Sequence, residues 1–298
     1  MRDVFATAAA WLNEGHACAF ATLIELREAK TAPLGTTIAI DDGGRIAGNI
    51  GAGCYEGEIV EAMQQTLSDG APRMLDVNLE SFDELAGGTG CGAQMRLAIW
   101  RPERDFLLTA RAIAEGERDV TLRVGEFIRV FPRKDTLLLV GATSLAADIA
   151  AIACRLEWRV IVVDPRPAFA TRERVADAHE IVQAWPDDYL PGALDARTSI
   201  VVLSHDPKFD LPALRLALRS DAPYIGLLGS RRAQAARRTT LRAEGFTERD
   251  LARIHGPAGL DIGGATTAET ALSILAEVIA ERNGRSGEPL LEARGAIH

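Results

Sequence analysis

The sequence predicts an α/β protein in which a small α+β domain precedes a Rossmann-like domain with a doubly wound parallel sheet. Three observations support this fold class: a length of 298 residues, a first part rich in short strands, and a second part with continuous apolar runs between helical segments. A chain of this length suffices for about two domains, which commonly have roughly 100–200 residues each. The pattern changes at Pro132-Arg133-Lys134-Asp135, so we place the domains at residues 1–133 and 134–298.

The N-terminal domain is expected to begin with an amphipathic helix at 4–14 and to consist largely of strands. The predicted strands are 17–26, 36–40, 45–49, 74–78, 94–100, 120–124 and 127–131. Asp41-Asp42-Gly43-Gly44 has the composition of a hairpin turn. Helical periodicity predicts further helices at 56–67 and between Pro102 and Glu115, which makes this domain mixed α+β.

The C-terminal domain contains four apolar runs that suit strands covered on both faces, as in a parallel sheet. These runs are 137–140, 159–163, 199–203 and 224–228. Helical segments separate them, and this alternation is typical of a doubly wound fold. The last strong helix is expected at 267–282, because Thr266 and Glu269 have the spacing of a capping box and Asn283-Gly284 ends the periodicity.

Composition and charge exclude several classes of function. Apolar residues make up 47% and charged residues 25% of the chain, as in ordinary globular proteins. A net charge of −9 argues against a general nucleic-acid-binding protein, which needs a basic surface. Without a signal-peptide pattern or an apolar run of about 18 residues, the expected location is the cytoplasm rather than a membrane. The four cysteines form no CxxC pair, so we expect buried fillers, metal ligands or reactive thiols.

A strand-to-helix loop in the C-terminal domain resembles the phosphate-binding loop of dinucleotide-binding proteins. Gly141-Ala142-Thr143 ends the first apolar run and opens a helix, whose free N–H groups favour an anion. Thr143 stands where G-x-G-x-x-G has its second glycine, which argues against tight dinucleotide binding. Asp164 follows at about the spacing of a ribose-binding acid, roughly 20 residues. Gly141 and Asp164 are therefore candidates for binding a nucleotide such as NAD(P), with Arg166 as a phosphate ligand or a solvated charge; a Rossmann sheet without such a ligand is the alternative.

A second loop with a possible anion site follows the last apolar run. Gly229-Ser230-Arg231-Arg232 leads into a predicted helix, although cations oppose the dipole at a helix N-terminus. An anion bound to them would explain their presence. The first three of these residues are therefore candidates for holding a phosphate or pterin-phosphate group. The alternative is an exposed charged turn that continues into the basic stretch with Arg237 and Arg238.

Two glycine-rich loops of the N-terminal domain each contain a cysteine. Gly53-Cys54-Tyr55-Glu56 leads into the predicted helix at 56–67, and a helix N-terminus lowers the pKa of a nearby thiol. Gly90-Cys91-Gly92 precedes the strand at 94–100, and its glycines allow a ligand to approach the backbone N–H groups. Cys54 and Cys91 are therefore candidates for soft-ligand or sulfur chemistry.

The remaining cysteines and the histidines are interpreted mainly as structural. Cys18 lies in a strand pattern and Cys154 in the first helix of the C-terminal domain, so both are expected in the core. His16 is close to Cys18, but the pair falls short of the four ligands of a structural zinc site. His205-Asp206 follows a strand at the expected ligand-facing edge of the sheet, where it contacts a ligand or caps a loop.

Taken together, these motifs resemble the XdhC/CoxI family of molybdoenzyme accessory proteins along nearly the whole chain. The family pattern Gly-Cys-x-Glu is present as Gly53-Cys54-Tyr55-Glu56, and Gly-x-Gly-Cys-Gly as Gly88-Thr89-Gly90-Cys91-Gly92. The C-terminal patterns are found at 224–232 and 259–263, the latter before the helix with Glu269. Gly51-Ala52-Gly53 departs from the more usual Ser-Gly-Gly.

The resemblance implies a protein that binds the molybdenum cofactor (molybdopterin), protects it while sulfur replaces an oxo ligand, and delivers it to a xanthine-dehydrogenase-type enzyme. It carries over Cys54 and Cys91 as contacts to the cofactor and its molybdenum, for which a thiolate is a suitable soft ligand. The N–H groups of the neighbouring glycines, together with Arg231, would hold the phosphate. A separate cysteine desulfurase-like sulfurtransferase would donate the sulfur, and a homodimer is expected.

Two other functions remain open at the level of sequence. The Rossmann-like domain suggests an NAD(P)-dependent oxidoreductase, and the paired thiols suggest a sulfur carrier that uses Cys54 and Cys91 directly. Fold alone does not decide among them, because one fold hosts many functions.

Overall fold

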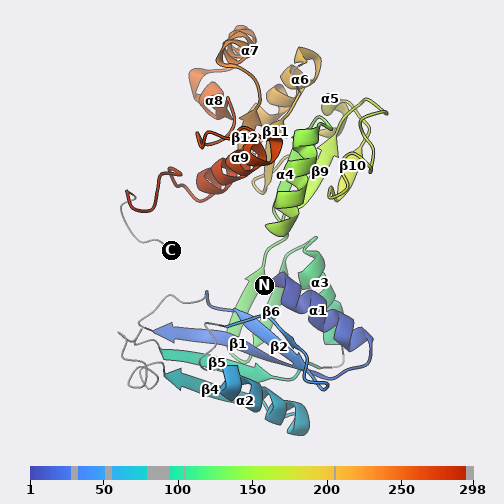
Figure 1. Ribbon diagram of the computed structural model, residues 1–298, viewed down its shortest axis with the longest axis vertical. Coiled ribbons are helices and arrows are strands. Elements are labelled where there is room, and N and C mark those ends of the chain that lie inside the picture. Colours follow the sequence, from blue (N-terminus) through green and yellow to red (C-terminus); the bar gives the residue numbers. More distant parts are fainter. Residues whose placement is uncertain (28–32, 51–55, 79–93, 104, 205, 293–298) are drawn as a thin grey trace. The chain divides into compact units, whose positions relative to one another are not determined.

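The computed structural model describes the chain except for residues 28–32, 51–55, 79–93, 104, 205 and 293–298. The chain divides into two compact units, Met1–Arg133 and the residues from Lys134 onward (Figure 1). The first unit contains an antiparallel sheet and the second a six-stranded parallel sheet, which confirms the predicted fold class.

The first unit is built on a five-stranded sheet in the order β3-β2-β1-β5-β4, with a separate hairpin β6-β7. Its strands are β1 (Cys18–Arg27), β2 (Thr37–Asp41), β3 (Ile46–Ala47), β4 (Arg73–Asn78), β5 (Gln94–Trp100), β6 (Val120–Val124) and β7 (Phe127–Phe131). Its helices are α1 (Arg2–Asn13), α2 (Glu56–Asp69) and α3 (Phe106–Glu115).

Helices cover both faces of this sheet, because alternate side chains of each strand point to opposite sides. From β1, Phe20 packs with Phe5 of α1 and Phe106 of α3. Its neighbour Ala21 belongs to the opposite layer, where the sheet packs against Ile59 of α2. The central strand is therefore apolar on both faces, which explains the nearly continuous apolar sequence of β1.

The second unit is a parallel sheet in the order β10-β9-β8-β11-β12-β13. Its strands are β8 (Thr136–Val140), β9 (Arg159–Val163), β10 (Glu180–Val182), β11 (Thr198–Val202), β12 (Ile225–Leu227) and β13 (Ile254–His255). Its helices are α4 (Ser144–Arg155), α5 (Pro186–Tyr189), α6 (Pro207–Leu218), α7 (Arg231–Ala243), α8 (Glu248–Ala252) and α9 (Thr267–Arg282).

The strand order is that of a dinucleotide-binding Rossmann sheet, 3-2-1-4-5-6. Leu137 and Leu139 of β8 pack in the layer of α4 and α9, whereas Leu138 and Val140 pack in the layer of α6 and α7. The chain reverses its direction of winding between the neighbouring strands β8 and β11. Ligands of open α/β sheets bind outside the carboxyl ends of the strands at such a reversal.

The four predicted strands of the parallel sheet are confirmed as β8, β9, β11 and β12, and the predicted helix at 267–282 is confirmed as α9. Thr266 and Glu269 form the expected capping box. The edge strands β10 and β13, of three and two residues, were not predicted. Their short segments acquire strand structure by pairing with β9 and β12.

Candidate functional site

The loop between β8 and α4 lies at the carboxyl edge of the parallel sheet, where a Rossmann ligand would bind. Gly141 has a φ of +111°, and a Cβ there would lie 3.4 Å from the backbone nitrogen of Ser204. The N–H of Gly141 donates to Val163 O at 2.9 Å. Thr143 caps α4, because its hydroxyl accepts a hydrogen bond from Ala146 N at 3.2 Å. Thr143 therefore replaces the second glycine of the motif with a helix cap.

Asp164, the candidate ribose-binding acid, is 1% exposed at the end of β9. Its Oδ2 accepts from Ala142 N at 2.8 Å and from Arg166 Nη2 at 2.7 Å. Its Oδ1 accepts from the backbone N and the Nε of Arg166, both at 2.9 Å. The carboxylate thus joins the loop after β8 to the loop after β9.

These contacts set the protonation state of Asp164. Burial by itself raises the pKa of the carboxyl group, but hydrogen bonds from Arg166 and Ala142 and the arginine charge outweigh it and leave the pKa below its ordinary value. The group is therefore ionised at neutral pH. The structure places Asp164 beside the Gly141 loop, as a nucleotide site requires, but directs both of its oxygens to protein donors.

The second candidate loop, between β12 and α7, lies at the same edge of the sheet. Ser230 caps α7 by accepting from Ala233 N at 3.3 Å, and Gly229 has a φ of +123°. Arg231 is the first residue of the helix and is exposed. Strand β11 lies between β8 and β12. This loop and the Gly141 loop therefore lie at the same edge of the sheet but are separated by one strand, and we treat them as two candidate sites.

The alternative left open by the sequence, an exposed charged turn that continues into a basic stretch with Arg237 and Arg238, does not hold for Arg237. The residue is only 6% exposed and forms a buried ion pair with Asp210 of α6. A Cβ on Gly229 would lie 3.1 Å from Arg237 Nη1, so the guanidinium lies close to this loop. The signal in the sequence was helical spacing, since Gln234, Arg237 and Leu241 form the buried face of α7.

The candidate cofactor loops of the first unit fall largely outside the described residues. This applies to Gly53, Cys54, Gly90, Cys91 and Gly92, and in the second unit to His205. Glu56 is described: it is half-buried and is the first residue of α2. An acidic residue at this position is favourable to the helix dipole. In sequence, Cys54 stands two positions before this helix N-terminus, as the hypothesis of a low-pKa thiol requires.

The two described cysteines are structural. Cys18 is buried in β1, which confirms the prediction, and burial together with the charges of Asp41 and Asp42 raises the pKa of its thiol to about 12. Cys154 packs at the margin of the core and is partly buried, and its Sγ donates to Asp177 O at 3.0 Å. Neither thiol is activated as a nucleophile.

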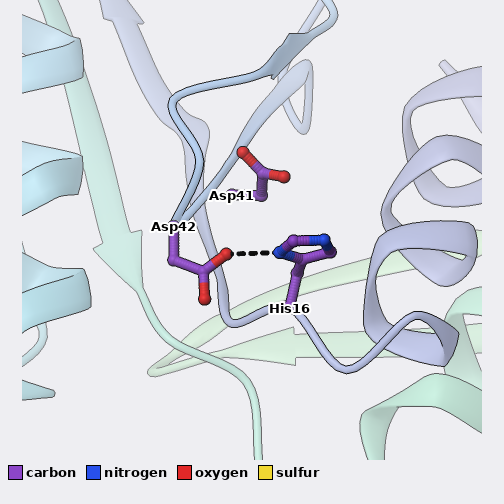
Figure 2. A group of neighbouring side chains, drawn as sticks. All are labelled: His16, Asp41 and Asp42. Atoms are coloured by element: carbon purple, nitrogen blue, oxygen red, sulfur yellow. Dashed lines mark hydrogen bonds and ion pairs between the residues drawn. The ribbon is translucent and has the colours of Figure 1, made fainter.

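A group of potential metal ligands lies at the β2–β3 turn of the first unit. Ligand atoms of His16, Asp41 and Asp42 lie within 4.8 Å of one another (Figure 2). His16 Nδ1 is 2.7 Å from Asp42 Oδ1. This arrangement brings together a histidine that the sequence paired only with Cys18 and two aspartates interpreted as a turn.

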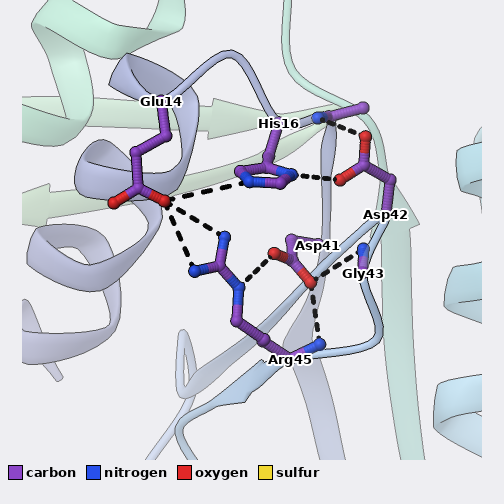
Figure 3. A network of polar contacts seen from close by, with 7 residues as sticks. Glu14, His16, Asp41, Asp42, Gly43 and Arg45 are labelled. Atoms are coloured by element: carbon purple, nitrogen blue, oxygen red, sulfur yellow. Dashed lines mark hydrogen bonds and ion pairs between the residues drawn. The ribbon is translucent and has the colours of Figure 1, made fainter.

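The hydrogen bonds of this group indicate a structural clamp on the hairpin. Asp41 Oδ1 accepts from the backbone nitrogens of Gly43 and Arg45 at 3.1 and 2.7 Å, and its Oδ2 accepts from Arg45 Nε at 2.5 Å (Figure 3). Glu14 lies 3.3 Å from the same guanidinium. Because the buried Asp41 carboxylate already has these donors, it is poorly placed to coordinate a cation.

Comparison with known protein families matches both units. Residues 137–278 match the XdhC Rossmann domain, and residues 11–78 match the XdhC and CoxI family. Among the described residues, no helix has the length and apolar character needed to cross a membrane.

Three curated proteins are similar to this chain. The "Molybdenum cofactor insertion chaperone PaoD" of Escherichia coli K12 is 25% identical over 287 residues, which cover 94% of this chain and 88% of PaoD. A protein of Bacillus subtilis 168, described as a probable xanthine dehydrogenase subunit, is 23% identical over 322 residues, with 92% of this chain and 96% of the relative covered. The "Uncharacterized protein YqeB" of Escherichia coli K12 is 28% identical over 244 residues, 82% of this chain, which spans only 40% of YqeB.

A solved structure has a fold similar to that of this chain. The crystal structure of a protein from Bacillus halodurans described as a xanthine dehydrogenase has a TM-score of 0.79 and 19% sequence identity, and 98% of each chain is covered. With both units matched by family models and the motifs of both present in order, the chain belongs to the XdhC and CoxI family.

Proposed function

We propose that this protein binds the molybdenum cofactor and serves as an accessory factor for its insertion into a xanthine-dehydrogenase-type enzyme. The observation that carries the proposal is the family match to both units, together with a similarity to the chaperone PaoD that covers 94% of this chain. The similarity to the Bacillus subtilis protein, described as part of a probable xanthine dehydrogenase, supports the class of target enzyme.

The proposed cofactor contacts are Cys54 and Cys91 in their glycine-rich loops. A thiolate is a soft ligand suited to molybdenum bound by sulfur. The backbone N–H groups of the glycines can donate hydrogen bonds to an anionic group. Glu56 lies in the first turn of α2, two positions after Cys54 in the sequence. Gly53, Gly90 and Gly92 would bring backbone N–H groups to the cofactor, and Arg231 remains the proposed contact to its phosphate.

Within this role, we infer that the cofactor is held while sulfur replaces an oxo ligand of its molybdenum. The sulfur would come from a separate cysteine desulfurase-like sulfurtransferase. The protein would act in the cytoplasm as a homodimer, with no nucleic acid as partner.

The test is anaerobic co-purification from cells that make the molybdenum cofactor, with bound molybdenum and pterin quantified. We expect near-stoichiometric cofactor on the native protein and a loss of both signals in Cys54→Ala or Cys91→Ala. Cys154→Ala is the matched control, because its thiol is partly buried and its pKa is raised, and it should retain the cofactor. Absence of cofactor from all four proteins, or equal amounts in all, contradicts the proposal; persulfide on either loop cysteine without molybdenum supports the sulfur-carrier alternative.

We also propose that the Rossmann unit binds a nucleotide at the carboxyl edge of its sheet. The strand order, the positive φ of Gly141 and the N-terminal turn of α4 support this part of the function. Asp164 contributes by fixing the loop through Ala142 N. Titration of the full chain with adenine nucleotides, followed by calorimetry, tests it.

A further inference from the structure

Arg166 has an unusual position for a residue next to a ribose-binding acid. It forms a two-pronged contact with Asp164 through Nε and Nη2, at 2.9 and 2.7 Å. Its side chain is nevertheless 41% exposed. Since guanidinium has five N–H donors, Nη1 and the outer N–H of Nη2 remain directed away from the carboxylate.

A free ribose diol does not find a free carboxylate acceptor in this arrangement. Diol recognition needs a carboxylate that accepts hydrogen bonds from the two ribose hydroxyls. The Asp164 oxygens accept four hydrogen bonds from Ala142 and Arg166 and are 1% exposed. A diol would have to displace Arg166 from a charge-assisted contact, which is stronger than the neutral bonds that it would gain.

A phosphate on the ribose can bind to this arrangement without displacing Arg166 from Asp164. The outward N–H groups of Arg166 are donors of the geometry that a phosphate accepts. We propose that the Rossmann unit selects a nucleotide whose ribose carries a phosphate over the same nucleotide with a free diol, and that Arg166 makes this selection. The inference rests on the nucleotide-binding part of the proposed function.

The guanidinium is held in place before any ligand arrives. Its central carbon lies 4.0 Å from the centroid of the Phe169 ring and 5.6 Å from that of Phe209. Phe209 stacks in turn on Trp185, with ring centroids 5.0 Å apart. Arg174 lies over the same Phe169 ring, 4.9 Å from its centroid. A preorganised cation loses less side-chain entropy on binding.

One carboxylate opposes the proposed phosphate. Asp206 is close enough for its charge to raise the pKa of Arg166, after the larger effect of the Asp164 contact. Its side chain caps α6 by accepting from Lys208 N at 2.9 Å. Asparagine is as good a cap as aspartate, so Asp206→Asn removes the charge and keeps the helix start.

The experiment measures the affinities of the full chain for adenosine 2′,5′-bisphosphate and 5′-AMP by calorimetry, with NADP⁺ and NAD⁺ as a second pair. We expect the 2′-phosphate to strengthen binding by about tenfold to a hundredfold, the range of a hydrogen bond to a charged group. Arg166→Gln, which keeps a donor for Asp164, should remove this preference, and Arg166→Lys should restore part of it. Asp206→Asn should increase it.

The matched control is Arg215→Gln. Arg215 of α6 contacts the Glu244 carboxylate through Nε and Nη2, as Arg166 contacts Asp164, and the substitution breaks this pair. It should leave the preference unchanged, and circular dichroism verifies that each variant is folded. Equal affinities for the two ligands in the native protein, or an unchanged preference in Arg166→Gln, overturn the selection by Arg166 while nucleotide binding stands. No binding of any of the four nucleotides overturns both the inference and the nucleotide part of the proposed function, and leaves the cofactor test untouched.

Discussion

The hydrogen bond between Tyr224 and Glu277 is expected to be a main anchor of α9 on the Rossmann sheet. Tyr224 is fully buried, and its hydroxyl donates to Glu277 Oε2. Glu277 also accepts from Gly259 N at 2.7 Å, and its Oε1 lies 3.5 Å from His255 Nδ1. Burial raises the pKa of Tyr224 well above its ordinary value, so the phenol remains a donor at any accessible pH. Tyr224→Phe removes this donor and little else.

The loss of stability in Tyr224→Phe depends on the hydrogen-bond donors that Glu277 keeps. A hydrogen bond to a charged group contributes about 1.5–3 kcal/mol, and the carboxylate keeps its other donors. We therefore expect a loss near the lower end, about 2 kcal/mol. For a unit of this size, 1 kcal/mol corresponds to roughly 2–4 °C, so the Tm should fall by about 4–8 °C at pH 7.

Thermal unfolding followed by circular dichroism measures this change. Tyr189→Phe is the control, because its hydroxyl interacts with Glu180, a carboxylate on the surface that also pairs with Arg159. It should lower the Tm by no more than about 2 °C, the effect of roughly 0.5 kcal/mol. A change of less than about 2 °C in Tyr224→Phe, or an equal loss in both variants, would refute the assignment of Tyr224 as an anchor.

Three further predictions concern charge, backbone and thiols. Burial raises the pKa of Glu277, but the hydrogen bonds to its carboxylate outweigh burial and hold the pKa below the ordinary 4.5. The stability of the protein should therefore fall as the pH drops from about 4.5 through the folded-state pKa of Glu277. Glu277→Gln should flatten this dependence in thermal melts at acid pH. Gly48→Ala should cost about 3 kcal/mol in urea unfolding, because φ is +88° and the new Cβ would lie 2.8 Å from Thr37 O. Iodoacetamide at pH 7.5 should modify Cys54 and Cys91 before Cys18, whose thiol pKa is about 12; mass spectrometry that finds Cys18 modified first would contradict this.

Local patterns in the sequence determined the main elements of the fold. The apolar runs that became β8, β9 and β11 needed no tertiary information, because strands covered on both faces are apolar throughout. The start of α9 followed from Thr266 and Glu269, since a capping box is a contact between residues three positions apart, and its end followed from Asn283-Gly284. The glycine–cysteine motifs likewise gave the family resemblance from adjacent residues.

Only the tertiary structure decided which partner each polar side chain meets. Asp164 has the spacing of a ribose ligand, but its contact with Ala142, 22 positions away, assigns its oxygens to the protein. Helical spacing places Arg237 on the buried face of α7, but only the packing of α6 against α7 pairs it with Asp210, 27 positions away. Strand β10 has no fully buried residue and exists through its pairing with β9. The physical reason is the same in each case: periodicity and capping act within a few residues, whereas a hydrogen-bond partner is chosen by the packing of distant segments, which leaves no periodic trace in the sequence.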